Sequence, residues 1–222
     1  MTERVVLEVA PKRTFASALD WPGWSRSGRT EDDALRALLE YGPRFAEVAR
    51  RAGLPFRVPS SVRSLEIVER LPGGGVTEFG APGKAAAAEE APTSATDLDR
   101  LRALMAAAWA TFDHSAKRAR GVELATGPRG GGRDAAKIVD HVRDAEVAYL
   151  GKLGSRAPAS VEELRATFTQ ALTAVATGQP VVNPSKTRKR WPPRYAVRRA
   201  AWHVLDHAWE IEDRSPGPSR GG

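Results

Sequence analysis

Residues 200–213 read Ala-Ala-Trp-His-Val-Leu-Asp-His-Ala-Trp-Glu-Ile-Glu-Asp, and this stretch decides how the second half of the chain folds. Its apolar residues recur at helical spacing, which predicts a helix over about 193–213. His203 and His207 stand four residues apart, so the helix places both imidazoles on one face, one turn apart. The stretch therefore offers two nitrogen ligands that could bind the same ion.

Three further stretches before it also have helical periodicity. They cover about 97–118, 134–153 and 160–177. Glycines follow the last two stretches, and Ser160-Val-Glu-Glu resembles a capping box that would open the third. The pattern predicts an all-α four-helix bundle over residues 97–214.

The first part of the chain has a mixed pattern. Strands are expected near 5–9, 14–19 and 64–71, and a helix is expected from Thr30, where Thr-Glu-Asp-Asp is a good N-terminal cap. This predicts a small α+β domain over residues 1–79. Residues 80–96 contain two prolines and no large apolar side chain, which is typical of a linker, and residues 215–222 are expected to form a flexible tail.

The second helix of the expected bundle contains a third histidine, His141. If this helix packs beside the last one, His141, His203 and His207 can ligate one divalent metal and leave coordination positions open, as catalytic sites do. The alternative is that these are ordinary surface or structural histidines. His114, near the end of the first helix, is expected to be a surface residue.

Two acidic residues lie one turn from the paired histidines. Glu210 and Asp206 could orient an imidazole, and Glu210 is the candidate catalytic base. On a helix that also contains Arg199 and Arg214, both could equally be ion-pair partners. The sequence leaves these roles open.

Positive charge is concentrated in the second part of the chain. Residues 1–96 contain 13 Lys and Arg residues and 13 Asp and Glu residues, whereas residues 97–222 contain 21 Lys and Arg residues and only 14 Asp and Glu residues. Arg129 and Arg133, in a glycine-rich loop before the second helix, are candidates for an anion site, with a flexible connection as the alternative. The cationic run 186–199 could bind an anionic ligand or form a solvated loop; no recognised nucleic-acid-binding motif accompanies it, and nucleic acid is not an expected partner.

The composition also limits the chemistry. The 222-residue chain has no cysteine, so a sulfur nucleophile must arrive on another molecule. No apolar stretch approaches the length of a membrane span and no leader segment is evident, so we expect a cytoplasmic protein without a membrane partner. The oligomeric state stays open, with a homodimer among the alternatives.

Residues 97–214 resemble the DinB-like metal-binding bundle superfamily. The match lies in Gly-Pro-Arg-Gly-Gly-Gly-Arg-Asp-Ala-Ala-Lys-Ile-Val-Asp-His with Ala-Glu-Val-Ala-Tyr-Leu, and in Arg-Arg-Ala-Ala-Trp-His-Val-Leu-Asp-His. The resemblance implies that His141, His203 and His207 are the ligands of a divalent ion. Residues 1–79 are similar to a HicB-type domain in Ala-Leu-Asp-Trp-Pro-Gly-Trp-Ser-Arg-Ser-Gly-Arg-Thr-Glu-Asp-Asp-Ala-Leu, a type associated with antitoxins.

Some DinB-like proteins are thiol-dependent transferases or isomerases. The resemblance therefore implies an enzyme in which zinc or nickel, or else iron, cobalt or manganese, activates a low-molecular-weight thiol toward a small electrophilic substrate. A metal-dependent hydrolase that activates water is one alternative. A non-catalytic regulatory protein with a HicB-like module is the other.

Overall fold

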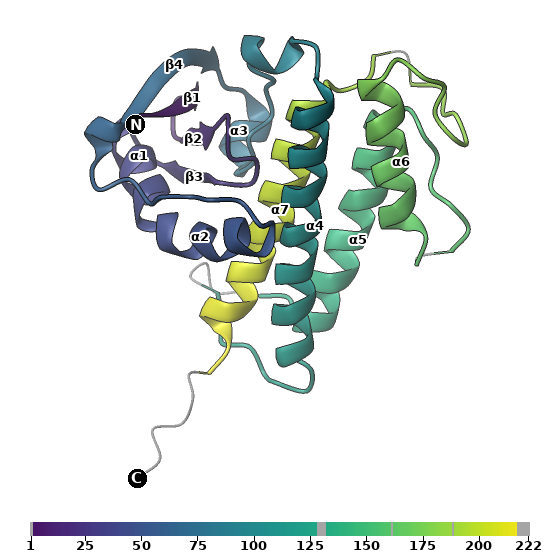
Figure 1. Ribbon diagram of the computed structural model, residues 1–222. Helices are drawn as coiled ribbons and strands as arrows, with labels where there is room; N and C mark the ends of the chain where they lie inside the picture. The colour runs from purple at the N-terminus through teal and green to yellow at the C-terminus, as the bar shows by residue number, and fades with distance from the viewer. Residues whose placement is uncertain (1, 128–131, 161, 188, 217–222) are drawn as a thin grey trace.

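The computed structural model describes residues 2–127, 132–160, 162–187 and 189–216 (Figure 1). Within these residues a small four-stranded sheet with helices comes first, and the remainder is mostly helical. The expected order of an α+β part followed by helices is confirmed at this level. Arg129 and the tail from residue 217 onward lie outside the described residues.

The sheet has the strand order β3-β2-β1-β4. β1 (Glu3–Val9) pairs antiparallel with β2 (Thr14–Ala18) and parallel with β4 (Leu65–Pro72). The apolar run at residues 5–7 is buried throughout, because both faces of β1 are covered. The sequence does not predict β3 (Ser25–Gly28), since its four residues lack the alternation of apolar and polar side chains that marks a strand.

The helical periodicity after Thr30 is divided between two helices, α1 (Glu31–Glu40) and α2 (Gly42–Arg51). Thr30 caps α1 as predicted: its hydroxyl accepts from the Asp33 N–H at 3.1 Å, and the Asp33 carboxylate accepts from the Thr30 N–H at 3.2 Å. The sequence predicts a single helix here, because apolar residues repeat at helical spacing from Leu35 to Val48, and that prediction is wrong. Pro43, in the first turn of α2, has no N–H to bond to the preceding turn, so the chain starts a new helix there.

Residues 80–96, the expected linker, connect the two parts and also pack against the fold. The buried Glu8 carboxylate of β1 accepts hydrogen bonds from the backbone N–H groups of Gly83 at 2.9 Å and Lys84 at 3.0 Å. The short helix α3 (Gly75–Phe79) contributes a threonine hydroxyl to the same carboxylate. These bonds hold the start of the connecting segment against the sheet.

Four long helices form the second part: α4 (Ala95–Arg118), α5 (Ala135–Lys152), α6 (Leu164–Ala176) and α7 (Pro193–Arg214). They lie close to the predicted stretches, except at the start of α6. The expected cap at Ser160 is wrong, because its hydroxyl bonds the Glu162 carboxylate before the helix begins. In the described part of the chain, no helix combines the length and apolar character that crossing a bilayer requires.

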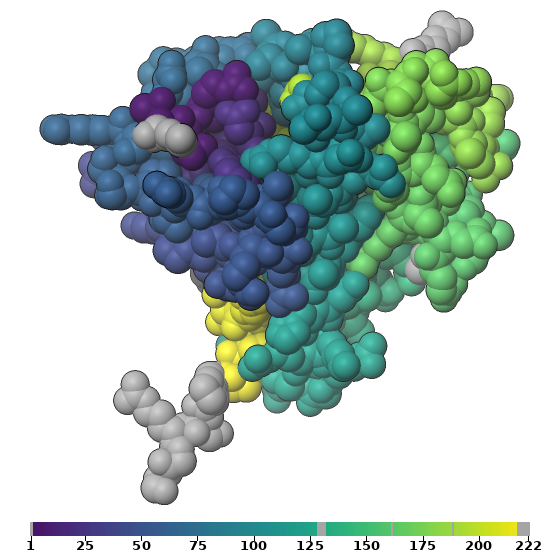
Figure 2. Space-filling model, in the orientation of Figure 1, coloured from purple at the N-terminus to yellow at the C-terminus, as the bar shows by residue number. Residues whose placement is uncertain are grey.

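α7 is buried along nearly its whole length, because it packs against α4 and α5 and also against the N-terminal part. Trp202 meets Phe15 of β2 edge to face with ring centroids 5.6 Å apart. A turn of the N-terminal part docks on the same helix at Gly23, whose φ is 100° and where a Cβ would lie 2.9 Å from Leu205. One hydrophobic core thus spans both parts, and they meet without a gap in Figure 2.

The connecting segment makes its deepest contact with α7. Glu89, in the 3-10 helix η2 (Ala87–Glu90), accepts two hydrogen bonds from the Arg198 guanidinium, at 2.7 and 2.8 Å. Both side chains are almost fully buried, with 3% and 2% exposed. The carbonyl of Lys84 takes a third bond from Arg198 at 2.8 Å. Because a buried ion must keep its partners, this pair fixes the segment on the helix.

Glu89→Gln should therefore destabilise the protein by about 3–5 kcal/mol, because it leaves the Arg198 charge buried without a counter-ion. The exposed neighbour Glu90 provides the matched control, and Glu90→Gln should change the free energy of unfolding by less than about 0.5 kcal/mol. Urea denaturation of the three proteins measures both values. Equal stability of the two variants would show that the buried pair does not hold the connecting segment.

Candidate metal centre

The structure brings His141, His203 and His207 together. α5 packs against α7, and one potential ligand atom from each of the three side chains lies within 4.8 Å of the others. The Nε2 atoms of His141 and His203 are 3.3 Å apart. Two nitrogens bound to one zinc at ~2.0–2.1 Å with a tetrahedral angle would be about 3.3 Å apart. The donor set, and the spacing of the His141–His203 pair, therefore fit a divalent ion.

The site favours the neutral form of His141 and His203, which is the form that binds a metal. Burial, with the neighbouring positive groups, lowers the pKa of His203 to about 2. Burial also lowers the pKa of His141, with a contribution from Arg133. The buried Nδ1 of His203 has no hydrogen-bond partner within the described chain. A metal ion shared by the three rings would offset part of the cost of burying these polar side chains together.

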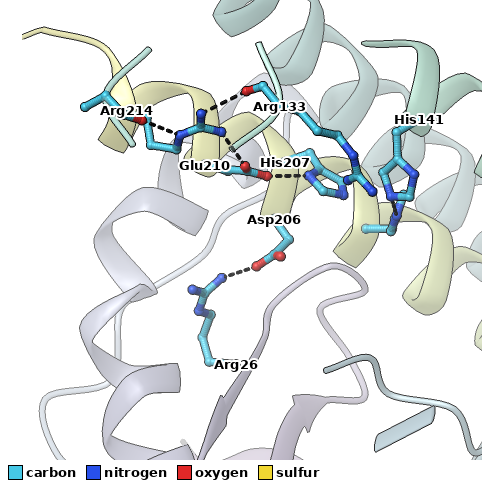
Figure 3. Close-up of polar contacts among 9 residues, drawn as sticks. Arg26, Arg133, His141, Asp206, His207, Glu210 and Arg214 are labelled. Atoms are coloured by element: carbon cyan, nitrogen blue, oxygen red, sulfur yellow. Dashed lines mark hydrogen bonds and ion pairs between the residues drawn. The ribbon is translucent and has the colours of Figure 1, made fainter. Parts of the chain in front are cut away.

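Glu210 joins this group through His207. One carboxylate oxygen lies 2.8 Å from His207 Nδ1, and the other accepts from Arg214 at 2.7 Å (Figure 3). The contact leaves His207 Nε2 as the nitrogen available to an ion. Hydrogen bonds to His207 and Arg214 lower the pKa of Glu210. This geometry fits two of the roles that the sequence leaves open for Glu210: it orients the imidazole of His207, and it forms an ion pair with Arg214.

Arg214 is itself held from two sides. Its guanidinium donates to the carbonyls of Ala125 and Arg133, each at 2.8 Å. These bonds attach the chain before α5 to the end of α7, close to the three histidines. Arg214 thereby positions both Glu210 and the backbone of Arg133.

Asp206 points away from the histidine cluster, as Figure 3 shows. Its carboxylate accepts a hydrogen bond from Arg26 of β3 at 2.8 Å. Asp206 is therefore an ion-pair partner, as one of the two alternatives predicts, and its partner lies in the N-terminal part. The Arg26 guanidinium also lies 3.7 Å from the centroid of the Tyr41 ring. Asp206 therefore links α7 to the first domain and is not a neighbour of the candidate ligands.

Two arginines place positive charge beside the cluster. Figure 3 shows the Arg133 side chain reaching toward His207 and His141, and the charges of Arg133 and Arg199 both lower the pKa of His203. The predicted anion-binding residue Arg133 thus lies beside the candidate metal ligands. Its expected companion, Arg129, is outside the described residues.

Tyr149 and Arg199 also lie beside the histidines, although their sequence positions do not predict a role in the site. The Tyr149 ring meets the His203 ring edge to face at 5.7 Å, and the Arg199 guanidinium lies 5.0 Å from the Tyr149 ring centroid. The signal for Arg199 is its position one turn before His203 on the same helix. Tyr149 lies two turns after His141, a spacing that does not distinguish it from other residues of α5.

Two arginines of the cationic run 186–199 make internal ion pairs, whereas Lys186, Lys189 and Arg190 are exposed. Arg198 pairs with Glu89 and Arg194 with Asp97, each at 2.7 Å. These arginines are engaged within the fold and do not form a free basic surface. His114 is exposed on α4, as expected for a surface residue.

Comparison of the chain with protein-family models, with curated proteins and with solved structures finds no match.

Removing the carboxylate of Glu210 should weaken metal binding without removing a ligand. Because outer partners of a ligating histidine typically contribute a factor of about 10–100 to metal affinity, Glu210→Ala should lower the zinc affinity by that factor. Glu210→Gln keeps an acceptor for His207 and should lose less. Competition titration with a chromophoric chelator measures these affinities, and an unchanged affinity in Glu210→Ala would remove Glu210 from the centre.

The metal-free protein should lose stability as the pH falls below 6.5, the ordinary pKa of a histidine. The folded-state pKa of His203, about 2, is depressed, so the unfolded chain binds more protons in this range. The free energy of unfolding should therefore fall by up to about 1.4 kcal/mol per pH unit. Urea titrations of chelator-treated wild type, His203→Gln and the surface control His114→Gln at several pH values test this. A slope in His203→Gln equal to that of wild type would contradict it.

Proposed function

We propose that this chain is a DinB-like metal-dependent enzyme that acts on a small electrophilic substrate with the help of a low-molecular-weight thiol. In this proposal α4–α7 are the four-helix bundle of that class, and His141, His203 and His207 are the metal ligands. The observation that carries the proposal is the convergence of the three imidazoles from α5 and α7.

A divalent ion at this position, zinc or nickel by preference, would supply Lewis acidity and lower the pKa of a thiol. The chain's own residues supply the rest. The imidazoles of His141, His203 and His207 would hold the ion. Glu210, fixed by Arg214, orients His207.

The positive side chains around the site support an anionic partner. Arg133 and Arg199 lie on the approaches to the histidines and can pair with a carboxylate of the thiol or of the substrate. Tyr149 and Trp202 supply ring surface beside Arg199, whose guanidinium is 4.8 Å from the Trp202 ring centroid. Together these residues can orient an anionic molecule and exclude water from the histidines.

A thiol is favoured over water because its own pKa, ~8.5, lies far below that of water, ~15.7, so an ion can generate the thiolate without a protein base that deprotonation of water would draw on. The two carboxylates nearest the ligands along α7 are both engaged: Asp206 binds Arg26, and Glu210 binds His207 and Arg214. The chain contains no cysteine, so the sulfur must come from a separate molecule. A thiol whose pKa is lowered by an ion needs no additional protein base.

For residues 1–79 we propose a HicB-like domain with a supporting role. Its sheet and turn pack on α7, and Arg26 binds Asp206 on the face of α7 that points away from the histidines. These contacts favour a domain that holds the metal-bearing helix in place over an independent regulatory module.

Zinc- or nickel-loaded protein should form adducts between an electrophile and mycothiol, bacillithiol or glutathione, at a rate that depends on the ion. His203→Ala/His207→Ala, which removes two ligands, should be inactive, and His114→Ala should match wild type. Thiol consumption and product formation by mass spectrometry provide the readout. Turnover of ester or phosphoester substrates without thiol, or no reaction with any of the three thiols, would contradict the proposal.

A further inference from the structure

Two arginines beside the three histidines lack a counter-ion. Arg133 and Arg199 make no ion pair with any other residue in the described part of the chain. Figure 3 shows Arg133 directed toward His207 and His141. Burial is the main reason that the pKa of His203 is low, and the charges of Arg199 and Arg133 lower it further. Positive charge is thus concentrated where the proposed ion would bind.

The nearby carboxylates do not offset this charge. Each already has an arginine partner: Asp206 pairs with Arg26 at 2.8 Å, Glu210 with Arg214 at 2.7 Å, and Asp144 with Arg143 at 3.9 Å. These pairs are formally neutral, and the three imidazoles contribute no negative charge. A divalent ion at the histidines would therefore lie beside two unpaired positive side chains, and like charges at short range repel.

The fold nevertheless holds Arg133 at this position through its backbone. The Arg214 guanidinium donates to the carbonyls of Arg133 and Ala125, each at 2.8 Å, and the Ala125 N–H donates to the Arg214 carbonyl at 2.8 Å. Gly132 lies so close to the Arg214 guanidinium that a Cβ there would overlap with it. The arrangement is unfavourable for a cation alone, whereas a cation and an anion bound together would satisfy both the histidines and Arg133.

From this charge balance we propose that the metal centre binds its divalent ion together with a small carboxylate, which Arg133 holds beside the ion and Arg199 attracts. Each ligand then raises the affinity of the centre for the other, by the same factor. The inference rests on the proposed metal centre but does not depend on thiol chemistry. Its consequence is that the ion is retained most tightly while a carboxylate-bearing molecule is bound.

Acetate is a suitable probe, because it offers one carboxylate and binds zinc only weakly in water. Competition titration of the full chain with a chromophoric chelator, at low chloride and constant ionic strength, measures the zinc affinity. Saturating acetate should raise this affinity about 5-fold or more. Acetamide, which has a similar shape and no charge, should leave it unchanged. Isothermal titration calorimetry should show the acetate affinity rising by the same factor when zinc is added.

Variants of Arg133 test its role with a sign that simple damage to the site would not produce. Without acetate, Arg133→Gln should bind zinc as tightly as wild type or more tightly, because a repelling charge has been removed. With acetate, the variant should show no further gain, whereas Arg133→Lys should keep part of it. Lys137→Gln removes a charge from the same end of α5, where Lys137 pairs with Asp134 at 3.1 Å, and should match wild type within about 2-fold.

The possible failures of the two proposals are distinguishable. Zinc binding that acetate does not change would overturn this inference and leave the metal centre in place. An acetate effect of equal size in Arg133→Gln would also overturn it, because the carboxylate would then bind the ion alone. Equally weak zinc binding by wild type and His203→Ala/His207→Ala would overturn the metal centre itself. Thermal unfolding of each variant, measured alongside, shows that the comparisons are made on folded protein.

Discussion

The burial of α7 on nearly all sides is the constraint on which the rest of the structure depends. A helix that packs against other helices on one face and a sheet domain on the other has little surface left for solvated charge. Its ionic side chains therefore need partners inside the fold. Arg198 forms an ion pair with Glu89, Asp206 with Arg26, and Arg214 with Glu210.

These pairings explain why the connecting segment and the first domain are fixed relative to the candidate site. Glu89 binds Arg198, which lies about one turn before His203 on α7. Arg26 binds Asp206, which lies between His203 and His207 in the sequence. The histidine pair is thus held from several sides by residues that are far away in the chain. A preorganised set of ligands costs less conformational freedom when it binds an ion.

α5 presents different chemistry on two faces. His141 faces α7 and meets His203, whereas Glu146, five residues later, lies 3.4 Å from Arg165 of α6. The same helix thus contributes one side chain to the candidate metal centre and a buried carboxylate to an ion pair with its other neighbour.

The sequence by itself determined the features that depend on local periodicity and caps: three of the strands, the helix start at Thr30, the four long helices and the pairing of His203 with His207 on one face. It could not determine β3, whose four residues have no apolar pattern, or the break at Pro43, because one apolar stripe can continue across two helices. Only the tertiary structure decided that the expected linker is held by Glu89, that Asp206 turns to Arg26, and that His141 meets the other two rings. Those outcomes depend on contacts between residues distant in sequence, which helical and strand periodicity do not encode.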